Sequence, residues 1–433
     1  MGAASVISWV ALIVENVPGA ATLTTRWFTS RRLLLLAILN LIAVLSYVLV
    51  GWVSSYFAHV FSIVYSTPDA RSYHVVGQWL LGLRPLPPES LMRPFFYPLL
   101  QELAALLGGT LGVWLLNVVL WFFALNVTAA ATFRFVRSSW VAAFVFLALA
   151  TNVSLILLTF HGLTETTVVA LLAVWIYGLS HLTSRPTAAQ VAWALLPVSL
   201  LTVVKPAFEI LLAVMFVVML VGVIRSTERG LAAAVFAACL IPVAMQLALE
   251  AYFNGYFGLS TIGERTFRAY FLARLDVAIG DTHNIRVARA KMSGLNNLES
   301  ARFALEHFRD SVRVFFYILR ENLHEGTNFL PDRPRIRNAL LIAVRAQFWV
   351  LIAMIPLVGV ALWRARDGRL ALLCAGILTI FLAGGLTFGQ GDRITVVAFP
   401  LWLVALVLAA KQAGAVELWR SLEARIRRPA PST

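Results

Sequence analysis

The chain is a series of long apolar runs separated by polar stretches. Each run is close to the ~20 residues that an α-helix needs to cross a bilayer. The runs are continuous rather than alternating, so they predict helices and exclude the strands of a membrane barrel. We predict an all-α polytopic transmembrane bundle of about ten spans. The expected spans lie near 33–53, 111–133, 140–160, 164–182, 189–204, 207–224, 231–250, 339–363, 370–388 and 394–410.

Two polar stretches, 54–110 and 251–338, are much longer than the others. A loop of such length usually has its own structure or a function. The second contains an amphipathic pattern over 299–322, with apolar residues at helical spacing. These apolar residues are Phe303, Leu305, Phe308, Val312, Phe315, Phe316 and Leu319. We expect one membrane domain over 1–433, in which surface-lying helices of 251–338 cap a cavity above the first outer loop.

Composition and charge agree with this architecture. Only 13% of the 433 residues are charged, against about 25% in soluble globular chains. The segment 1–22 contains no Lys or Arg, so it lacks the basic region of a signal peptide, and we expect a short interfacial helix there.

The Lys and Arg residues before the first predicted span and after the second, fourth, sixth, eighth and tenth all fall on one side of the bundle. The positive-inside rule makes that side cytoplasmic and places both termini inside, in a multi-pass protein of the cytoplasmic membrane. The residues concerned are Arg26, Arg31, Arg32, Arg134, Arg137, Arg185, Arg225, Arg229, Arg364, Arg366, Arg369, Lys411, Arg420, Arg425, Arg427 and Arg428. The net charge of +14 therefore reflects topology, and it does not indicate binding to nucleic acid.

The opposite, outer face then collects polar segments that are far apart in the sequence. They are 54–110, the corner His161–Glu165, Lys205-Pro206, 251–338 and Gly389–Arg393. We expect these segments to converge on the outer face.

Asp69 and His74 lie in the first of these segments. Asp69 follows Pro68 and opens a predicted helix over 70–81. It could be a helix cap, worth about 1 kcal/mol, or a general base that takes a proton from an acceptor hydroxyl. His74 could bind a lipid phosphate or be a structural interfacial histidine.

Arg93 and Tyr97 belong to the kinked aromatic sequence RPFFYP. They could anchor the chain at the membrane interface, or they could bind an anionic headgroup.

Glu165 and Lys205 lie at the ends of predicted spans. An ionisable residue at membrane depth suggests a function, although an acid at a helix N-terminus also interacts with the helix dipole. Pro206 should break the helix after Lys205, which leaves the lysine to snorkel or to bind phosphate. Glu209, four residues later, could pair with it.

Arg393 follows two glycines in the sequence Gly389-Gln-Gly-Asp-Arg. Glycine lets the backbone approach a ligand closely, and the planar guanidinium suits phosphate oxygens. Asp392 would orient the arginine. A plain turn with a salt bridge is the alternative.

Several chemistries have no motif in the sequence. It contains no P-loop, dinucleotide fingerprint, hydrolase elbow or HExxH sequence, no Cys/His spacing for zinc, and no DxD pair. We therefore predict neither a metal nor a cofactor. The two cysteines, Cys239 and Cys374, fall in apolar runs, and they predict no disulfide framework.

The first outer loop resembles the GT-C superfamily of integral membrane glycosyltransferases, which includes polyprenyl-phosphate-sugar-dependent enzymes of bacterial cell envelopes. The matching features are Asp69 with Tyr73, Trp79-Leu-Leu-Gly82 and Arg93-Pro94 followed by Tyr97-Pro98, with the Thr-Glu corner, the Lys-Pro pair and Arg393 elsewhere. Many relatives have paired acids in this loop, whereas Ala70 follows Asp69 here, and this leaves the acceptor open.

The resemblance implies transfer of a hexosyl or pentosyl group from a polyprenyl-phosphate-linked donor at the outer face. Asp69 would be the base and Glu165 a second acid. The phosphate would be held by Lys205, Arg393, His74 and Arg93 with Tyr97. The acceptor would be a lipid-linked glycan, a lipid or a protein.

The alternative is a transporter or flippase of lipid-linked sugars, which should line a central path with charges and show internal repeats. Charges crowd one face here and no repeat is evident. Arg345, inside the eighth predicted span, fits the transporter slightly better. A purely structural scaffold would not explain the polar corners.

Overall fold

The computed structural model describes residues 30–325, 329–330, 334–365 and 367–414. Within these ranges the chain is all helical, which confirms the predicted fold class. The main helices of the bundle are α3 (Ser30–Val53), α6 (Phe96–Val136), α7 (Ser139–Ala150), α8 (Val153–Leu158), α9 (Glu165–His181), α10 (Ala188–Val204), α11 (Glu209–Arg225), α12 (Arg229–Cys239), α13 (Ile241–Asn254), α19 (Pro334–Ala353), α20 (Ile355–Ala365), α21 (Gly368–Leu386) and α22 (Phe399–Gln412). The interfacial helix expected over 1–22 and the basic C-terminal tail lie outside the described residues.

Each predicted span coincides with one or two apolar helices, but not all of these helices are long enough to cross a membrane. Among the described residues, six segments are long and apolar enough to cross a membrane: Leu33–Val53, Phe96–Val136, Pro206–Arg225, Arg229–Asn254, Pro334–Trp363 and Gly368–Leu386. Four further apolar helices are shorter: Ser139–Ala150, Glu165–His181, Ala188–Val204 and Val396–Gln412. The protein is therefore a multi-pass membrane protein.

Two predicted boundaries differ from the structure for local reasons. The expected span 140–160 is divided, because the Asn152 side chain accepts a hydrogen bond from the Leu155 amide and starts α8. Helix α6 begins well before the expected residue 111, and Gly108 and Gly109 lie outside helical backbone geometry within it. Gly109 has φ 57° and ψ −142°, a conformation that only glycine adopts readily.

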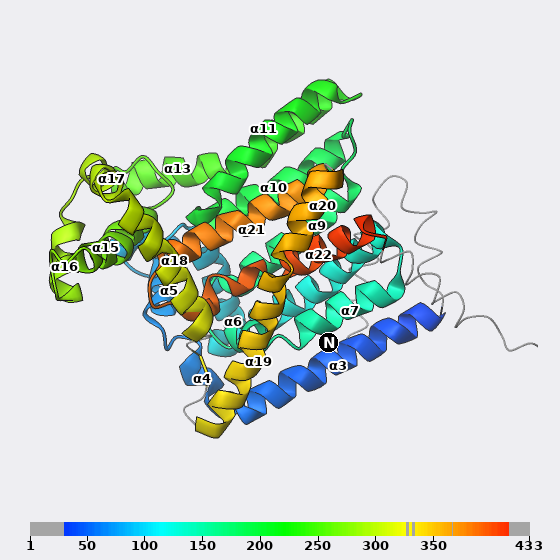
Figure 1. Ribbon diagram of the computed structural model, residues 1–433, viewed down its shortest axis with the longest axis horizontal. Coiled ribbons are helices and arrows are strands. Elements are labelled where there is room, and N and C mark those ends of the chain that lie inside the picture. Colours follow the sequence, from blue (N-terminus) through cyan, green and yellow to red (C-terminus); the bar gives the residue numbers. More distant parts are fainter. Residues whose placement is uncertain (1–29, 326–328, 331–333, 366, 415–433) are drawn as a thin grey trace, which may run out of the picture.

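Helices α9 and α10 form the centre of the bundle (Figure 1). Helix α9 is buried along almost its whole length, and it packs against α6 and α10. The large side chains Trp121 of α6, Phe146 of α7, Trp175 of α9 and Phe160 are fully buried in the core that surrounds these helices. A helix that is apolar on all sides is expected where it meets protein or lipid all round.

The segment 54–110, which is predicted to be the first outer loop, is itself largely helical. It contains η1 (Phe57–His59), α4 (Val60–Ile63), α5 (Pro68–Leu80), η2 (Pro88–Met92) and the first turns of α6. The Thr67 hydroxyl caps α5 by accepting from the Ala70 amide, and Pro68 occupies the first turn. Asp69 is consequently not the cap, and its carboxylate is available for tertiary contacts.

The long loop forms a helical unit at one end of the bundle (Figure 1). Its elements are α14 (Ile262–Thr266), η4 (Phe267–Leu272), α15 (Ala273–Ala278), α16 (Ile285–Ser293), α17 (Asn297–Glu306) and α18 (Phe308–Glu325). The predicted amphipathic segment 299–322 is divided between α17 and α18, because the backbone leaves helical geometry at His307. The unit has its own small core, which includes Phe271, Leu275, Met292 and Ile318.

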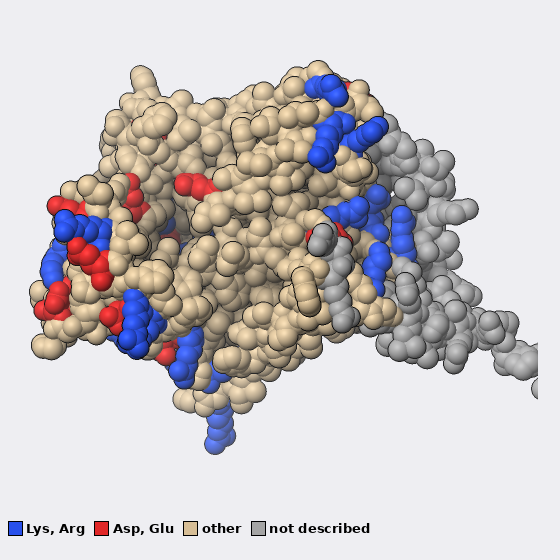
Figure 2. Space-filling view, turned by 45° about the horizontal axis from the view of Figure 1, so that its top comes forward, with Lys and Arg blue, Asp and Glu red and all other residues tan. Residues whose placement is uncertain are grey.

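Basic residues gather at the opposite end of the bundle, as the charge pattern predicts. Lys411 donates to the Phe135 carbonyl at the end of α6, and Arg369 donates to the Leu182 carbonyl at the end of α9. Arg185, Arg225 and Arg229 line one surface hollow there. Figure 2 shows Lys and Arg dominating this end, whereas acidic and basic residues mix at the other. That the basic end faces the cytoplasm stays a prediction.

Candidate functional site

Charged residues from the predicted outer segments form one connected network. Arg93 Nη2 lies 2.5 Å from Asp69 Oδ1, and Arg393 Nη1 lies 2.8 Å from Asp69 Oδ2. Arg393 also donates through Nε to Glu165 Oε1 at 2.7 Å. Lys205 Nζ lies 3.3 Å from the same Glu165 oxygen. Five of the seven predicted site residues thus alternate in charge along one chain of contacts.

Each side chain reaches the network because an element begins or ends there. Asp69 lies in the first turn of α5, and Glu165 is the first residue of α9. Lys205 is the C-cap of α10, because Pro206 cannot continue that helix. Arg93 follows η2 in extended backbone. Arg393 ends η5 (Gly391–Arg393).

The loop before Arg393 depends on its glycines. Gly389 has φ +75° and Gly391 has φ +59°, and both values favour glycine strongly. Between them, Gln390 accepts a hydrogen bond from Arg393 Nη1 at 3.3 Å. The glycines therefore provide the turn, and the residue between them helps to hold the arginine.

The network is buried and carries a surplus of positive charge. The side chain of Glu165 is 1% exposed, that of Arg393 12% and that of Asp69 30%. Three cations (Arg93, Lys205 and Arg393) face two carboxylates. An unbalanced buried charge is costly, so the site favours an added anion, and Asp69 marks its most accessible side.

Asp69 is fully ionised in this arrangement. Burial alone would raise the pKa of its carboxyl, but Arg393 and Arg93 outweigh that effect and lower the pKa to about 2. While both arginines hold the carboxylate, Asp69 is a poor proton acceptor at neutral pH. It becomes more basic only if the arginines move to another anion.

Aromatic residues form one wall of the network. Arg93 lies over the ring of Tyr73, with its guanidinium carbon 4.6 Å from the ring centroid, and it donates to the Tyr73 hydroxyl and to Ser72. Tyr97 packs edge-on against Tyr73 with ring centroids 4.9 Å apart. Tyr97 is thus buried behind Tyr73 and does not lie at the lipid interface.

The structure does not bring His74 into the network. Its Nδ1 lies 2.6 Å from Glu102 Oε2, and its Nε2 lies 3.1 Å from Gln78 Nε2. Its ring packs on Tyr65. Both nitrogens are engaged between α5 and α6, so binding phosphate through His74 would first require these contacts to break.

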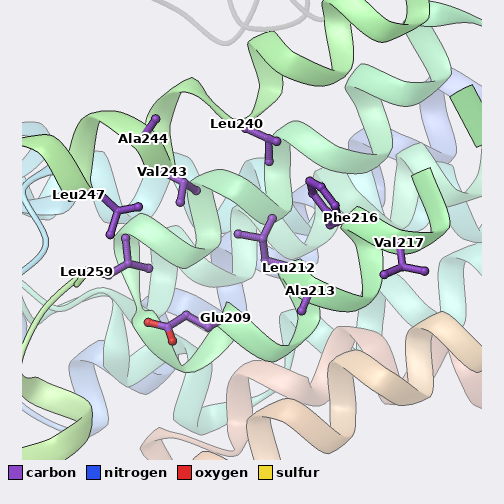
Figure 3. Close-up of a pocket in the computed structure, with 10 residues that line it drawn as sticks. All are labelled: Glu209, Leu212, Ala213, Phe216, Val217, Leu240, Val243, Ala244, Leu247 and Leu259. Carbon is purple, nitrogen blue, oxygen red and sulfur yellow. The ribbon is translucent and has the colours of Figure 1, made fainter. Parts of the chain in front are cut away.

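Lys205 has a different partner from the one that the sequence suggested. It pairs with Glu165, forty positions away, whereas Glu209 points into an apolar groove (Figure 3). The groove has a volume of about 580 Å³ and lies between α11 and the α12–α13 helices. Leu212, Phe216, Leu240, Val243, Leu247 and Leu259 are among its lining residues. Glu209, which lines this apolar hollow, follows Lys205 of the network by four residues in the sequence.

Within the described ranges, no three His, Cys, Asp or Glu side chains come close enough to hold a metal ion. Asp69 and Glu165 are each engaged by arginine instead. The chemistry of the site is that of carboxylates, guanidinium groups and an ammonium group.

Comparison with known proteins gives one match. No family model and no curated protein matches the chain. The chain is similar to the crystal structure of ArnT from Cupriavidus metallidurans bound to undecaprenyl phosphate. The match covers 94% of this chain and 82% of that one, with 12% identity and a TM-score of 0.40.

Two supporting residues were not anticipated from the sequence. Ser154 donates to Asp392 Oδ2 at 2.5 Å, which ties η5 to α8. Asn322 of α18 contacts the loop that leads to Arg393. A third supporting residue, Gln390, could have been suspected from the sequence, because it lies between two glycines beside a charged pair. Nothing in the sequence pointed to Asn322, because its hydrogen-bond partners are more than sixty residues away.

Burial of Asp392 gives a prediction for stability. Burial raises the pKa of this carboxyl to about 7, against the opposing hydrogen bond from Ser154. Between pH 4 and pH 7 the folded protein keeps a proton that the unfolded chain has lost, so stability falls as the pH rises through that window. Asp392→Asn keeps an acceptor for Ser154 and cannot ionise. We expect it to raise the thermal unfolding midpoint at pH 8 by several degrees and to have a clearly smaller effect at pH 5, where only part of the loss has occurred.

The measurement is thermal unfolding in nanodiscs at both pH values. Exposed Asp281→Asn is the matched control and should show no such difference. An equal shift at pH 5 and pH 8 would contradict the assignment.

Proposed function

We propose that this protein is a membrane glycosyltransferase that moves a sugar from a polyprenyl-phosphate-linked donor to an acceptor hydroxyl. The observation that supports this most is the surplus of buried cations in the network. A lipid-linked sugar phosphate has an anion, which these cations can bind, and a long apolar tail, for which the groove lined by Glu209 and α11 is a candidate site. The reaction would take place at the outer face of the cytoplasmic membrane.

The donor phosphate would bind among Arg393, Lys205 and Arg93. These residues reach the site from three separate elements, so they can surround the phosphate oxygens. Guanidinium groups bind such oxygens through two parallel hydrogen bonds. In a water-poor site, stabilising the departing phosphate is expected to be the largest contribution to the rate.

The transfer step needs one proton acceptor. The acceptor oxygen attacks the anomeric carbon, the bond from that carbon to the phosphate oxygen breaks, and the polyprenyl phosphate leaves with the electron pair. The hydroxyl proton passes to Asp69, with Glu165 as the second candidate. When Arg93 and Arg393 turn toward the donor phosphate, they release Asp69 and make it more basic. Donor binding would thus prepare the base.

Arg345, the residue that fitted the transporter alternative better, has a structural partner instead. Arg345 Nε donates to the His324 carbonyl at the end of α18, at 2.6 Å. An arginine that donates to the last carbonyls of a helix stabilises the end of that helix. This contact does not indicate a transport path. The first test is incubation of the purified protein with a lipid extract, to ask which polyprenyl-phosphate sugar is consumed. Movement of lipid-linked sugar across vesicles without its consumption would favour the transporter.

The groove gives a prediction about the donor tail. Ala213→Trp places a large side chain in the groove. Each CH₂ group displaced from an apolar site costs about 0.8 kcal/mol, so loss of two such contacts should raise the KM for the lipid donor by on the order of tenfold. The turnover number at saturating donor should stay unchanged. Leu378→Trp, on an exposed position of α21, is the control. A normal KM for Ala213→Trp would remove the groove from the donor site.

A further inference from the structure

Helix α18 presents an apolar stripe that no described part of the protein covers. Phe308 and Phe316 are 65% and 62% exposed, and Val312 between them is 39% exposed. Residues four apart lie on the same face of a helix, so the three side chains form one continuous stripe. Solvent contact over so much aromatic surface usually marks an interaction site.

Arginines lie along one edge of this stripe. Arg309, Arg313 and Arg320 are exposed. Arg309 and Arg313 each come one position after an apolar residue of the stripe, and Arg320 comes four positions after Phe316. Arg313 pairs with Asp310 at 3.2 Å. In the described part of the chain, no acidic side chain pairs with Arg309 or Arg320. Apolar side chains beside unpaired arginines match a lipid surface, whose acyl boundary lies just below its phosphates.

The position of α18 agrees with such a partner. Its other face packs on the end of α21, where Phe315 fits against Gly385 because a glycine has no side chain there. Eight residues separate the end of α18 from the start of the long apolar helix α19, and Figure 1 shows α18 lying across the end of α21 at one end of the bundle. The helix therefore lies at one end of the bundle, across the end of a long apolar helix.

The buried face of α18 holds the loop that carries Arg393. Asn322 Nδ2 donates to the carbonyls of Gly384 at 3.0 Å and Thr387 at 2.7 Å. Its Oδ1 accepts from the Gln390 amide at 3.2 Å. Gln390 in turn accepts from Arg393. One fully buried side chain thus joins the surface helix to the network.

We propose that α18 lies in the phosphate headgroup layer of the membrane and that this contact fixes the position of Arg393 through Asn322. Phe308, Val312 and Phe316 enter the acyl boundary, and the arginines meet lipid phosphates. Asn322 is a positioning residue. The effect on sugar transfer rests on the proposed function, whereas the lipid contact does not.

The lipid contact can be tested with spin labels in vesicles of phosphatidylethanolamine and phosphatidylglycerol. Single cysteines at positions 312 and 316 would be introduced after Cys239 and Cys374 are replaced by serine. We expect both labels to be relaxed by dissolved oxygen, which concentrates in lipid, and to be protected from a water-soluble nickel complex. A label at Arg302, which is 78% exposed on α17, should show the reverse. Labels at 312 and 316 that behave like the one at 302, or that are shielded from both reagents, would overturn the proposal.

The coupling to Arg393 can be tested without an assay of sugar transfer. Hydrogen exchange of the segment 387–393 would be measured in nanodiscs of the same lipids. Asn322→Ala removes hydrogen bonds worth about a fivefold change in local opening, and Val312→Asp should speed exchange in the same direction. Val287→Asp, at an exposed valine of α16 outside the stripe, is the matched control. Exchange that is unchanged in both Asn322→Ala and Val312→Asp, or changed equally by Val287→Asp, would exclude the coupling.

Discussion

Asp69→Asn should abolish sugar transfer while the protein keeps, or slightly improves, its affinity for the donor. General bases contribute about 10²–10⁴-fold to rates, so turnover should fall by at least about 100-fold. Donor affinity should not fall, because Asp69 competes with the donor phosphate for Arg93 and Arg393. The measurements are single-turnover transfer and binding of the polyprenyl-phosphate sugar in nanodiscs.

Two further variants sharpen this result. Asp310→Asn removes an exposed carboxylate of the outer unit and should leave turnover unchanged. Asp69→Glu keeps a base in a shifted position and should retain part of the activity. If Asp69→Asn turns over at near the normal rate, Asp69 is not the base, and Glu165 becomes the residue to test. If donor affinity falls strongly instead, the carboxylate contributes to binding rather than to chemistry.

Arg393→Ala should reduce both donor affinity and stability. Arg393 bridges Asp69 and Glu165, and Glu165 is fully buried. Breaking a buried ion pair on one side costs about 3–5 kcal/mol, because the other charge is left unpaired. The unfolding midpoint should therefore drop clearly, in addition to a loss of donor binding that exceeds tenfold for a charged hydrogen bond of about 1.5–3 kcal/mol.

Arg393→Lys separates the two effects. Lysine keeps the charge but has no planar fork, and it cannot contact both carboxylates in the same way. We expect most of the stability to return while donor affinity stays reduced. Arg302→Ala, which breaks an exposed pair with Glu306, should change neither quantity. An Arg393→Lys protein with normal affinity would show that the site needs only a positive charge, and normal affinity in Arg393→Ala would end the phosphate assignment.

The two variants test different stages of one exchange of partners. In the structure, the arginines hold Asp69 and keep its pKa near 2. In the proposed reaction, the donor phosphate replaces that carboxylate as their partner. The first variant removes the competing anion and the second removes the cation. Opposite changes in donor affinity for Asp69→Asn and Arg393→Ala are therefore the result that supports the exchange most directly.

The apolar pattern alone determined the all-α membrane fold and located the apolar helices, because a helix in lipid must be apolar over a fixed length. Local chemistry also indicated where the helices would end at the site. Pro206 leaves Lys205 at a helix terminus, and Gly389 and Gly391 provide the turn before Arg393. Polar residues at such interruptions are visible in a sequence, because they contrast with the apolar spans around them.

Only the tertiary structure decided which charges are partners. Lys205 could reach Glu209 along its own chain, yet it pairs with Glu165 on a neighbouring helix. His74 belongs to the same helix as Asp69 but faces Glu102. Asn322 reaches the Arg393 loop from a helix that the sequence marks only as amphipathic. Ion pairs and hydrogen bonds require separations of a few ångströms, and those depend on how helices pack rather than on their order. The sequence therefore identified the charged residues of the site, and helix packing joined them into one network.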